Sequence, residues 1–429
     1  MKPSPSDGLT RRDFVRATSA MAAAAVAGRV GGKAGEESSA ATPAQKLASK
    51  GSKAYLEDRS LFTPAKEFRD VSRGNPKPFA ITGDALARAR LTPQDWRLEI
   101  ITDPAIPAGI AEVPGTANSF TLADGTAMNL ASLLNLGRTV GVRFLKAMQC
   151  LNIPQPLGQG LWEGVPLRDV LRLCGPMRNV RRVFYSGFHN NDPAQLFQSS
   201  LSYTQAMETP PGGLPAFLAY RLNGEPIPLI RGGPVRMVIP WAHGFKSIKW
   251  LQRIVLTNDY KINDTYAEQN NDPESHLKTA AYFNELTAKH PVGQPVRLNG
   301  LVISGFSGLK RVEFSLAPDS SRADSATERD GSRWTEAELE EPPLDWTNVL
   351  PGKISPRSVL GFDPRTGHPQ SWPLPYSMIS WHAVIENLPP GKYSVRARAV
   401  DLNGFAQPEP RPNQKSGRNA VETKEFEVA

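Results

Sequence analysis

Two cysteines have the clearest potential for chemistry, and they lie in different settings. Cys150 ends the apolar and basic run GVRFLKAMQC, which is typical of a strand, and the loop LNIPQPLGQG follows it. A loop at a strand end suits a site residue, and a thiolate there would bind a soft metal. Cys174 lies in VLRLCG near a predicted helix end, where we expect a buried structural thiol.

A metal at Cys150 would need other ligands, because one thiolate cannot hold zinc alone and the chain has no His-x-x-His or Cys-x-x-Cys motif. A cofactor that brings most of its own ligands would need only this one from the protein. A disulfide between Cys150 and Cys174 is the alternative in an oxidising compartment. We favour it less, since a strand end and a buried helix face rarely bring two Cβ atoms within reach.

Strands and helices are mixed in residues 61–285, the region that must position Cys150. Helical spacing occurs at 129–137 and at 166–175, where Gly175 is expected to cap the second helix. Strand-like apolar runs occur at residues 95–102, 180–188, 234–241 and 248–257.

Short alternating segments separated by Gly, Pro, Asn and Asp follow in residues 290–429. This pattern predicts a β-sandwich of immunoglobulin size. The predicted fold class is therefore α+β, with a mixed domain at 61–285 before an immunoglobulin-like sandwich.

The N-terminal segment has the pattern of a twin-arginine export signal. Arg11 and Arg12 precede Phe14 and a weakly apolar, Ala-rich run. We interpret residues 1–41 as this signal and residues 42–60 as a polar linker. Twin-arginine substrates usually cross the membrane folded, so we expect a periplasmic or otherwise exported protein that carries a cofactor inserted in the cytoplasm.

The formal charge of +8 is compatible with an anionic partner. Lys and Arg are scattered, and no nucleic-acid motif accompanies them, so we do not expect nucleic-acid binding. No later stretch has 18 uninterrupted apolar residues, and we expect no transmembrane segment in the mature chain.

Four stretches occur in a fixed order along the chain. The first is Cys150 followed by GLWEGVPLRDVLRLCG, and the second is LAYRLNGEPIP at 218–228. The third is GGPVRMVIPWAHGFKSIKWLQRI at 232–254, and the fourth is the C-terminal region with VEFSLAP and SWHAVIENLPPGKYSVRARAVDLNGF. In combination they resemble the sulfite oxidase family of molybdopterin oxidoreductases over about residues 60–429.

The resemblance implies that Cys150 ligates molybdenum and that the cofactor is Mo-molybdopterin. It implies that Arg236 binds the pterin phosphate, which needs charge-assisted donors. Tyr266 is the nearest candidate for the family's active-site tyrosine. The other implied cofactor contacts are Arg231, Ser247, Ile248 and Lys249, with His189 and His243 as further candidates.

The chain departs from the family where substrate would bind. The family's Arg-Asn-His cluster is missing from residues 79–91, where Arg88 or Arg90 is the expected substitute. LNIPQ follows Cys150, so an arginine that would hold sulfite is absent there. Lys415 or Arg418 is a further expected source of positive charge. Because an oxyanion needs several donors, we expect sulfite to bind more weakly than in relatives, or not at all.

The expected function is oxygen-atom transfer at a mononuclear molybdenum, with sulfite oxidised to sulfate. No Cys-x-x-Cys-His haem motif is present, so the expected electron partner is a separate cytochrome or quinone-linked carrier. The substrate would be a small oxyanion or sulfur compound, and the C-terminal domain would form a homodimer. The alternatives are a reductase of sulfoxide-type substrates and a non-catalytic binding protein that retains the fold.

Overall fold

The computed structural model describes residues 61–104, 112–151, 153–259, 274–318, 333–408 and 419–429. The predicted signal at 1–41 and linker at 42–60 lie outside the described residues, as do Tyr266, Lys415 and Arg418.

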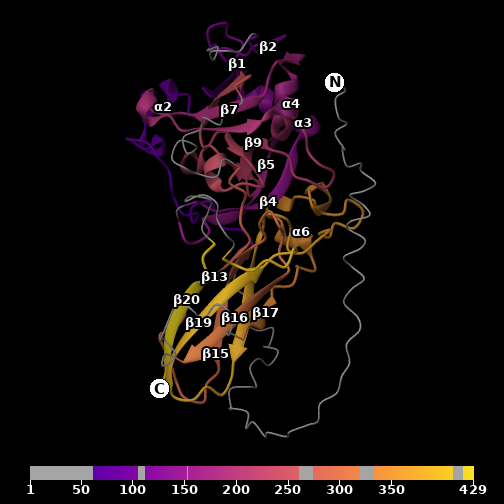
Figure 1. Ribbon diagram of the computed structural model, residues 1–429. Helices are drawn as coiled ribbons and strands as arrows, with labels where there is room; N and C mark the ends of the chain where they lie inside the picture. The colour runs from indigo at the N-terminus through magenta and orange to yellow at the C-terminus, as the bar shows by residue number, and fades with distance from the viewer. Residues whose placement is uncertain (1–60, 105–111, 152, 260–273, 319–332, 409–418) are drawn as a thin grey trace, which may run out of the picture. The chain divides into compact units, whose positions relative to one another are not determined.

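One mixed five-stranded sheet, in the order β3-β1-β12-β7-β8, lies in the N-terminal region (Figure 1). β1 pairs with β12 in parallel, and the other neighbours are antiparallel. The predicted strand-like runs in this region are confirmed. The strands are β1 Arg97–Thr102, β3 Met128–Asn129, β7 Arg182–Gly187, β8 Gln198–Ser202 and β12 Leu251–Thr257.

A second sheet carries the segment that leads to Cys150. Its order is β10-β9-β5-β4, with β11 paired to β9. β4 ends at Met148, two residues earlier than the sequence suggested, because the Gln149 carbonyl accepts from the Gly244 amide and the chain turns away there. The strands are β4 Val142–Met148, β5 Gly158–Pro166, β9 Phe217–Leu222, β10 Glu225–Pro226 and β11 Arg236–Val238.

Short helices border these two sheets. α3 Leu130–Val140 begins where the Asn129 side chain accepts from the Ser132 amide. α4 Leu167–Arg172 ends before the expected cap at Gly175, because Leu173 is the C-cap and the following amides bond only three residues back. No described helix is long and apolar enough to cross a membrane. The remaining elements are α2 Gly83–Arg88, α5 Tyr203–Met207, β2 Gly115–Thr116, β6 Met177–Arg178, η3 Pro78–Ala80, η4 Pro193–Gln195, η5 Leu229–Arg231 and η6 Gly244–Lys246.

The C-terminal region forms an eight-stranded sheet in the order β13-β15-β18-β17-β16-β19-β20-β14. β17 pairs with β16 through its first residues and with β18 through its last, so it joins two halves of the sheet. Buried side chains from both halves pack into one core. The strands are β13 Ala280–Phe283, β14 Lys289–His290, β15 Val296–Ile303, β16 Arg311–Pro318, β17 Thr335–Leu339, β18 Met378–Ile385, β19 Gly391–Val400 and β20 Glu422–Val428.

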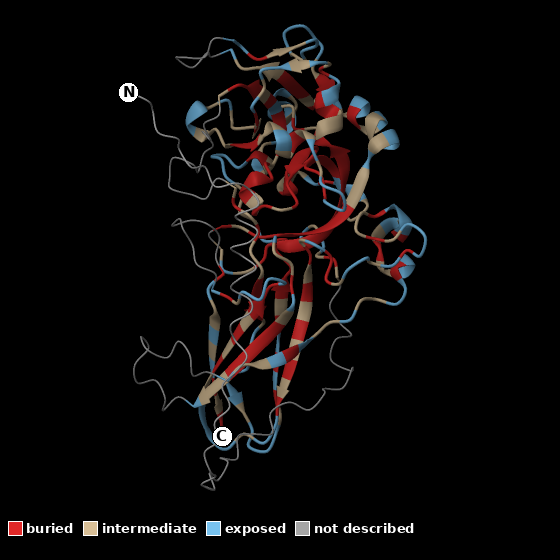
Figure 2. Cartoon of the chain, turned by 45° about the vertical axis from the view of Figure 1, so that its right-hand side comes forward, coloured by how far each residue is buried: buried red, intermediate tan, exposed pale blue. Residues whose placement is uncertain are grey.

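Burial distinguishes the strands of the two regions (Figure 2). All nine residues of β5 are buried, whereas buried and half-buried residues alternate along β18. Alternation is what one buried and one solvated face produce. The loops of the C-terminal region contain α6 Trp346–Val349, η9 Pro351–Lys353 and η10 Pro356–Ser358.

The C-terminal sheet begins earlier along the chain than expected. β13 pairs with β15 in antiparallel register from Ala280 to Phe283. These residues fall inside the range 61–285 that the sequence assigned to the first domain. All four residues of this strand are apolar and buried. The sequence there lacks the apolar–polar alternation from which the sandwich was predicted.

Candidate functional site

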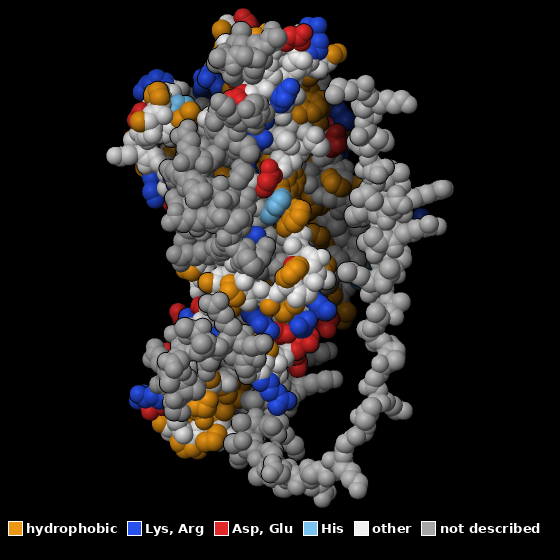
Figure 3. Space-filling view, in the orientation of Figure 1, with side chains coloured by type: hydrophobic (Ala, Val, Ile, Leu, Met, Phe, Trp, Pro, Cys, Tyr) orange, Lys and Arg blue, Asp and Glu red, His pale blue; other side chains and the backbone are white. Residues whose placement is uncertain are grey.

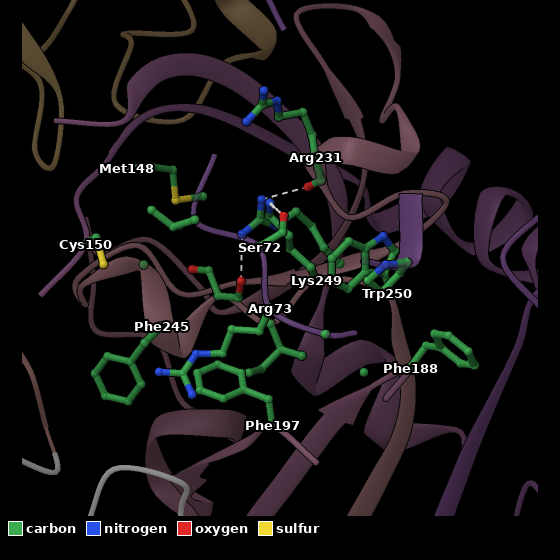
Figure 4. Close-up of a pocket in the computed structure, with 18 of the residues that line it drawn as sticks. Ser72, Arg73, Met148, Cys150, Phe188, Phe197, Arg231, Phe245, Lys249 and Trp250 are labelled. Carbon is green, nitrogen blue, oxygen red and sulfur yellow. Dashed lines mark hydrogen bonds between the residues drawn. The ribbon is translucent and has the colours of Figure 1, made fainter. Parts of the chain in front are cut away.

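A cavity of about 280 Å³ brings together most of the predicted site residues (Figure 4). Cys150 lies on it, just after β4. The loop between β11 and β12 and the segment before β11 supply the opposite group of side chains. The predicted residues that line the cavity are Cys150, His189, Arg231, Arg236, Ser247, Ile248 and Lys249.

Arg236 is a buried member of this group. Its guanidinium donates to the carbonyl oxygens of Arg231, at 2.8 Å, and Ser247, at 2.6 Å. It also lies 5.1 Å from the ring centre of Trp162, at cation–π distance. These contacts fix the guanidinium where β11 begins, so its orientation does not depend on a ligand.

Lys249 comes from the segment before β12 and reaches back across the cavity. Its ammonium donates to Ser72 Oγ at 2.5 Å and to the Ile230 carbonyl at 3.0 Å, and it pairs with Asp70 at 3.2 Å. Arg231 lies beside it and donates to the Ala65 carbonyl at 2.8 Å. We call Arg231, Arg236 and Lys249 the cationic cradle.

Glycine is needed where the backbone passes Lys249. Gly232 has φ of +97°, and a Cβ there would lie 2.6 Å from the Lys249 Cγ. Any larger residue would therefore be strained and would also displace the lysine side chain. The glycine pair before PVR thus allows Lys249 to enter the cradle.

Burial lowers the pKa of all three cations, and like-charge repulsion adds to it for Arg236 and Lys249. Burial, with the nearby Arg236, lowers the pKa of Lys249 to about 7, even though Asp70 opposes the change. Burial and the charge of Arg231 lower the pKa of Arg236 to about 9. Although burial alone would raise it, hydrogen bonds from Ser72 and the charge of Lys249 hold the pKa of Asp70 well below its usual range.

The cradle fits a multiply charged anion. Among the described residues that line the cavity, five are Arg or Lys and none is Asp or Glu. The buried Arg236 Nε has no hydrogen-bond partner in the described part of the chain, and a buried donor without an acceptor is costly. A phosphate group supplies both the missing acceptors and the missing negative charge.

The loop around Cys150 is held by Gln149. Its side-chain amide donates to the carbonyls of Cys150, at 3.1 Å, and Ile153, at 2.7 Å. Cys150 is half-buried and its thiol is free, so the alternative disulfide with Cys174 is not formed. The described residues contain no group of three His, Cys, Asp or Glu that could hold a metal. A metal at Cys150 would therefore be held by this one protein thiolate together with ligands from a cofactor.

Cys174 has the structural role that its setting predicted. It has no exposed surface and belongs to the main core of the N-terminal region. Burial raises the pKa of its thiol to about 11. It therefore stays protonated at neutral pH and is a poor metal ligand.

The further cations that line the cavity differ from the expected ones. Arg69 and Arg73 line the cavity, while Arg88 is exposed on α2 and Arg90 donates to Gln252 at 3.4 Å; neither lines it. The expectation failed because the segment 68–74, and not 79–91, runs along the cavity. Two arginines four residues apart before the first strand were the only sequence signal for this.

The two histidines have different positions. His189 lines the cavity, and its Nδ1 lies 3.2 Å from the Gly187 carbonyl oxygen. His243 is buried and is not among the described lining residues. Its backbone amide donates to the Ser275 carbonyl. The next residue along the chain, Gly244, does line the cavity.

Comparison with known proteins finds a family match for part of the chain. Residues 89–265 match the family described as "oxidoreductase molybdopterin binding domain". The chain is 35% identical over 110 residues to nitrate reductase [NADPH] of Fusarium oxysporum, covering 26% of this chain and 12% of that protein. It is 30% identical over 115 residues to mitochondrial sulfite oxidase of Drosophila melanogaster, covering 27% of this chain and 19% of that protein. The chain thus matches less than a fifth of the length of these relatives.

A solved structure has a similar fold. The sulfane dehydrogenase SoxCD from Paracoccus pantotrophus superposes with a TM-score of 0.52 at 16% identity, covering 82% of this chain and 86% of that one. With an anion cradle and a free thiol in one cavity, residues 89–265 of this chain match a molybdopterin-binding oxidoreductase domain and are similar to segments of nitrate reductase and sulfite oxidase.

Proposed function

We propose that the protein is an exported enzyme that transfers an oxygen atom to a sulfur oxyanion at a mononuclear molybdenum. The simplest such reaction oxidises sulfite to sulfate. One observation carries the proposal: the free thiol of Cys150 lines the same cavity as the cationic cradle. A cofactor with a phosphate at one end and a thiolate-binding metal at the other would satisfy both groups.

In this proposal, the residues of the cavity bind and orient the cofactor. Arg236, Arg231 and Lys249 hold its phosphate, and Ser247 and Ile248 border it. Cys150 provides the protein's thiolate to the molybdenum. When bound, the cofactor supplies two-electron oxygen-atom transfer, while the protein supplies binding, orientation and charge.

The finer features of the chain belong to the same proposal. Residues 1–41 would be a twin-arginine signal, and Tyr266 would be the tyrosine near the metal. The C-terminal sheet would be an immunoglobulin-like dimerisation domain, and its two joined halves around one core support this. A separate cytochrome or quinone-linked carrier would accept the electrons one at a time.

Reduction of nitrate is the second candidate. Nitrate reductases of Fusarium oxysporum and Glycine max match segments of this chain at 35% and 30% identity. Nitrate is a planar monoanion, and the arginines that line the cavity would attract it as they would a sulfur oxyanion.

Metal analysis and two assays test the proposal. The purified protein is expected to contain about one molybdenum per chain and to reduce cytochrome c when sulfite is added. Nitrate reduction with a reduced dye, measured on the same preparation, separates the second candidate. A protein that holds no molybdenum, or one that reduces nitrate and leaves all sulfur oxyanions untouched, would contradict the proposed reaction.

A further inference from the structure

Gln149 stands directly before Cys150, and its backbone and side chain together hold the chain on both sides of the thiol. Its backbone carbonyl accepts from the Gly244 amide at 2.7 Å. Its side-chain amide donates to the carbonyl of Cys150 at 3.1 Å and to that of Ile153 at 2.7 Å. Gln149 is 1% exposed, so its amide group is shielded from water.

These hydrogen bonds fix the backbone dihedral angles of Cys150. The Gln149 carbonyl belongs to the peptide plane that precedes the Cys150 Cα, and the Cys150 carbonyl belongs to the plane that follows it. Because peptide units are planar, a residue turns only through φ and ψ between its two planes. When both planes are held, the direction of the Cys150 Cα–Cβ bond is held as well. Only the rotation of the thiol about that bond is left.

Two other buried glutamines show how a structural glutamine is satisfied in this fold. Gln159 is also 1% exposed and donates to the carbonyls of Leu61 and Met378. Its side-chain oxygen accepts from the Met378 amide at 2.6 Å. Gln407 donates to two backbone carbonyls and accepts from two backbone amides. In both residues the nitrogen and the oxygen of the side chain are bonded.

Gln149 differs because its side-chain oxygen is buried without a hydrogen-bond partner in the described part of the chain. Turning the amide over would not help, since the oxygen would then face the carbonyl oxygens of Cys150 and Ile153. A buried acceptor without a donor lowers stability. An apolar side chain would avoid that cost, and the two carbonyls could bond to water because Cys150 and Ile153 are half-buried. Stability alone therefore does not account for a glutamine here.

We infer that Gln149 is a positioning residue for the metal ligand, which holds the Cys150 thiol toward the cavity through the peptide planes on either side of it. This inference rests on the proposed function, in which Cys150 binds the molybdenum. Partners that orient a metal ligand without touching the metal typically change metal affinity or activity by about 10- to 100-fold. Glycine at 244 suits the same contact, because a Cβ there would lie 3.2 Å from the Gln149 carbonyl oxygen.

Thiol reactivity tests the positioning of Cys150 without any cofactor. In the full chain prepared without pterin, peptide mass spectrometry follows the alkylation of Cys150 by iodoacetamide at neutral pH. Gln149→Met should raise the alkylation rate about 5- to 150-fold, the effect of losing two hydrogen bonds that keep the thiol half-buried. Methionine is neutral, so the substitution adds no charge beside the thiol. Cys174 in the same digest is the internal reference, because it is buried.

The molybdenum-containing enzyme gives the second measurement. Gln149→Met should lower kcat with sulfite about 10- to 100-fold, while the pterin content stays unchanged because the cationic cradle is intact. X-ray absorption at the molybdenum edge should show a diminished sulfur shell, whatever the substrate is.

Gln159→Met is the matched control, because Gln159 is equally buried and also donates to two carbonyls, but its partners lie outside the Cys150 loop. It loses three satisfied hydrogen bonds, so it should lower the melting temperature. It should leave the alkylation of Cys150 and the sulfur shell unchanged. Gln149→Met should do the opposite on both counts.

The outcomes separate this inference from the proposed function. Unchanged alkylation of Cys150 in Gln149→Met overturns the inference, even in an enzyme that contains molybdenum and oxidises sulfite. A Gln149→Met variant that melts as far below the wild type as Gln159→Met also overturns it, because the role would then be structural. A wild-type protein that holds no molybdenum overturns the proposed function, whereas the alkylation rates still decide whether Gln149 positions the thiol.

Discussion

Lys146 offers a quantitative test of the electrostatics around the cradle. It lies on β4, four residues before Cys150, and has no exposed surface. Its ammonium donates to the carbonyl oxygens of Pro240, at 2.6 Å, and Ala242, at 3.2 Å. Burial, with a further contribution from Arg236, lowers its pKa from 10.5 to about 7.

The sign of the effect follows from proton binding. Between pH 7 and 10.5 the unfolded chain keeps the Lys146 proton and the folded chain has lost it, so stability rises with pH across this window. Below pH 7 both states are protonated, and the folded state carries the full cost of a buried charge. Integrating the two titrations gives a change of about 2.5 kcal/mol between pH 6 and pH 9.

Lys146→Met removes the titrating group and keeps an unbranched apolar chain of similar length. The free energy of unfolding, variant minus wild type, should be about 2.5 kcal/mol more positive at pH 6 than at pH 9. Urea denaturation in phosphate-free buffer measures it. The difference in hydrogen bonding between the charged and the neutral Lys146 is already contained in its folded-state pKa, so it needs no separate correction. Lys392→Met is the matched control, since Lys392 is also on a strand but exposed.

A difference that stays the same at both pH values would refute this reasoning. It would mean that the Lys146 ammonium keeps its proton in the folded protein at pH 9 as well as at pH 6. The carbonyls of Pro240 and Ala242 would then compensate the charge much more fully than burial suggests.

Four further predictions concern the two cysteines, the cradle and export. Cys150→Ala should abolish turnover and leave the pterin bound, which pterin fluorescence and metal analysis would check; Cys174→Ala should cost only about 1 kcal/mol of stability by denaturation. Arg236→Met should lower pterin content by about 10-fold or more, because a charge-assisted phosphate contact is lost. Lysine at both Arg11 and Arg12 should leave cofactor-loaded precursor in the cytoplasm, as fractionation would show; unchanged periplasmic activity would contradict this.

The cradle could be predicted because its parts follow one another closely along the chain. Arg231, Arg236 and Lys249 lie within one stretch, with β11 and the start of β12 fixing their spacing. Strand and turn patterns depend on neighbouring residues, so they can be recognised in the sequence without knowledge of the tertiary fold. The same holds for Cys150, whose place after an apolar run determines that it leaves the sheet at a loop.

Arg69 and Arg73 could not be placed from the sequence. Their segment has no regular element before η3, so no periodicity reveals which side chains face inward. Its position depends on contacts that are remote in sequence, above all the ion pair between Asp70 and Lys249. Such a contact is set by the finished fold, and a single sequence gives no means of inferring it.

Charge on the surface and charge in the interior have different consequences in this protein. On the face in Figure 3, Lys and Arg lie interspersed with Asp and Glu, as expected for a net charge that does not gather into one patch. Inside, Lys146 and Arg236 are buried and Lys249 is half-buried, and the charge of Arg236 lowers the pKa of both lysines. Hydrogen bonds to carbonyls offset only part of the cost of burying these charges.

A bound phosphate would offset more of the cost of burying these charges, and any ligand that binds only the folded state stabilises that state. Cofactor binding and folding stability are therefore linked through these same residues, which is consistent with the proposal that the chain is loaded before it is exported.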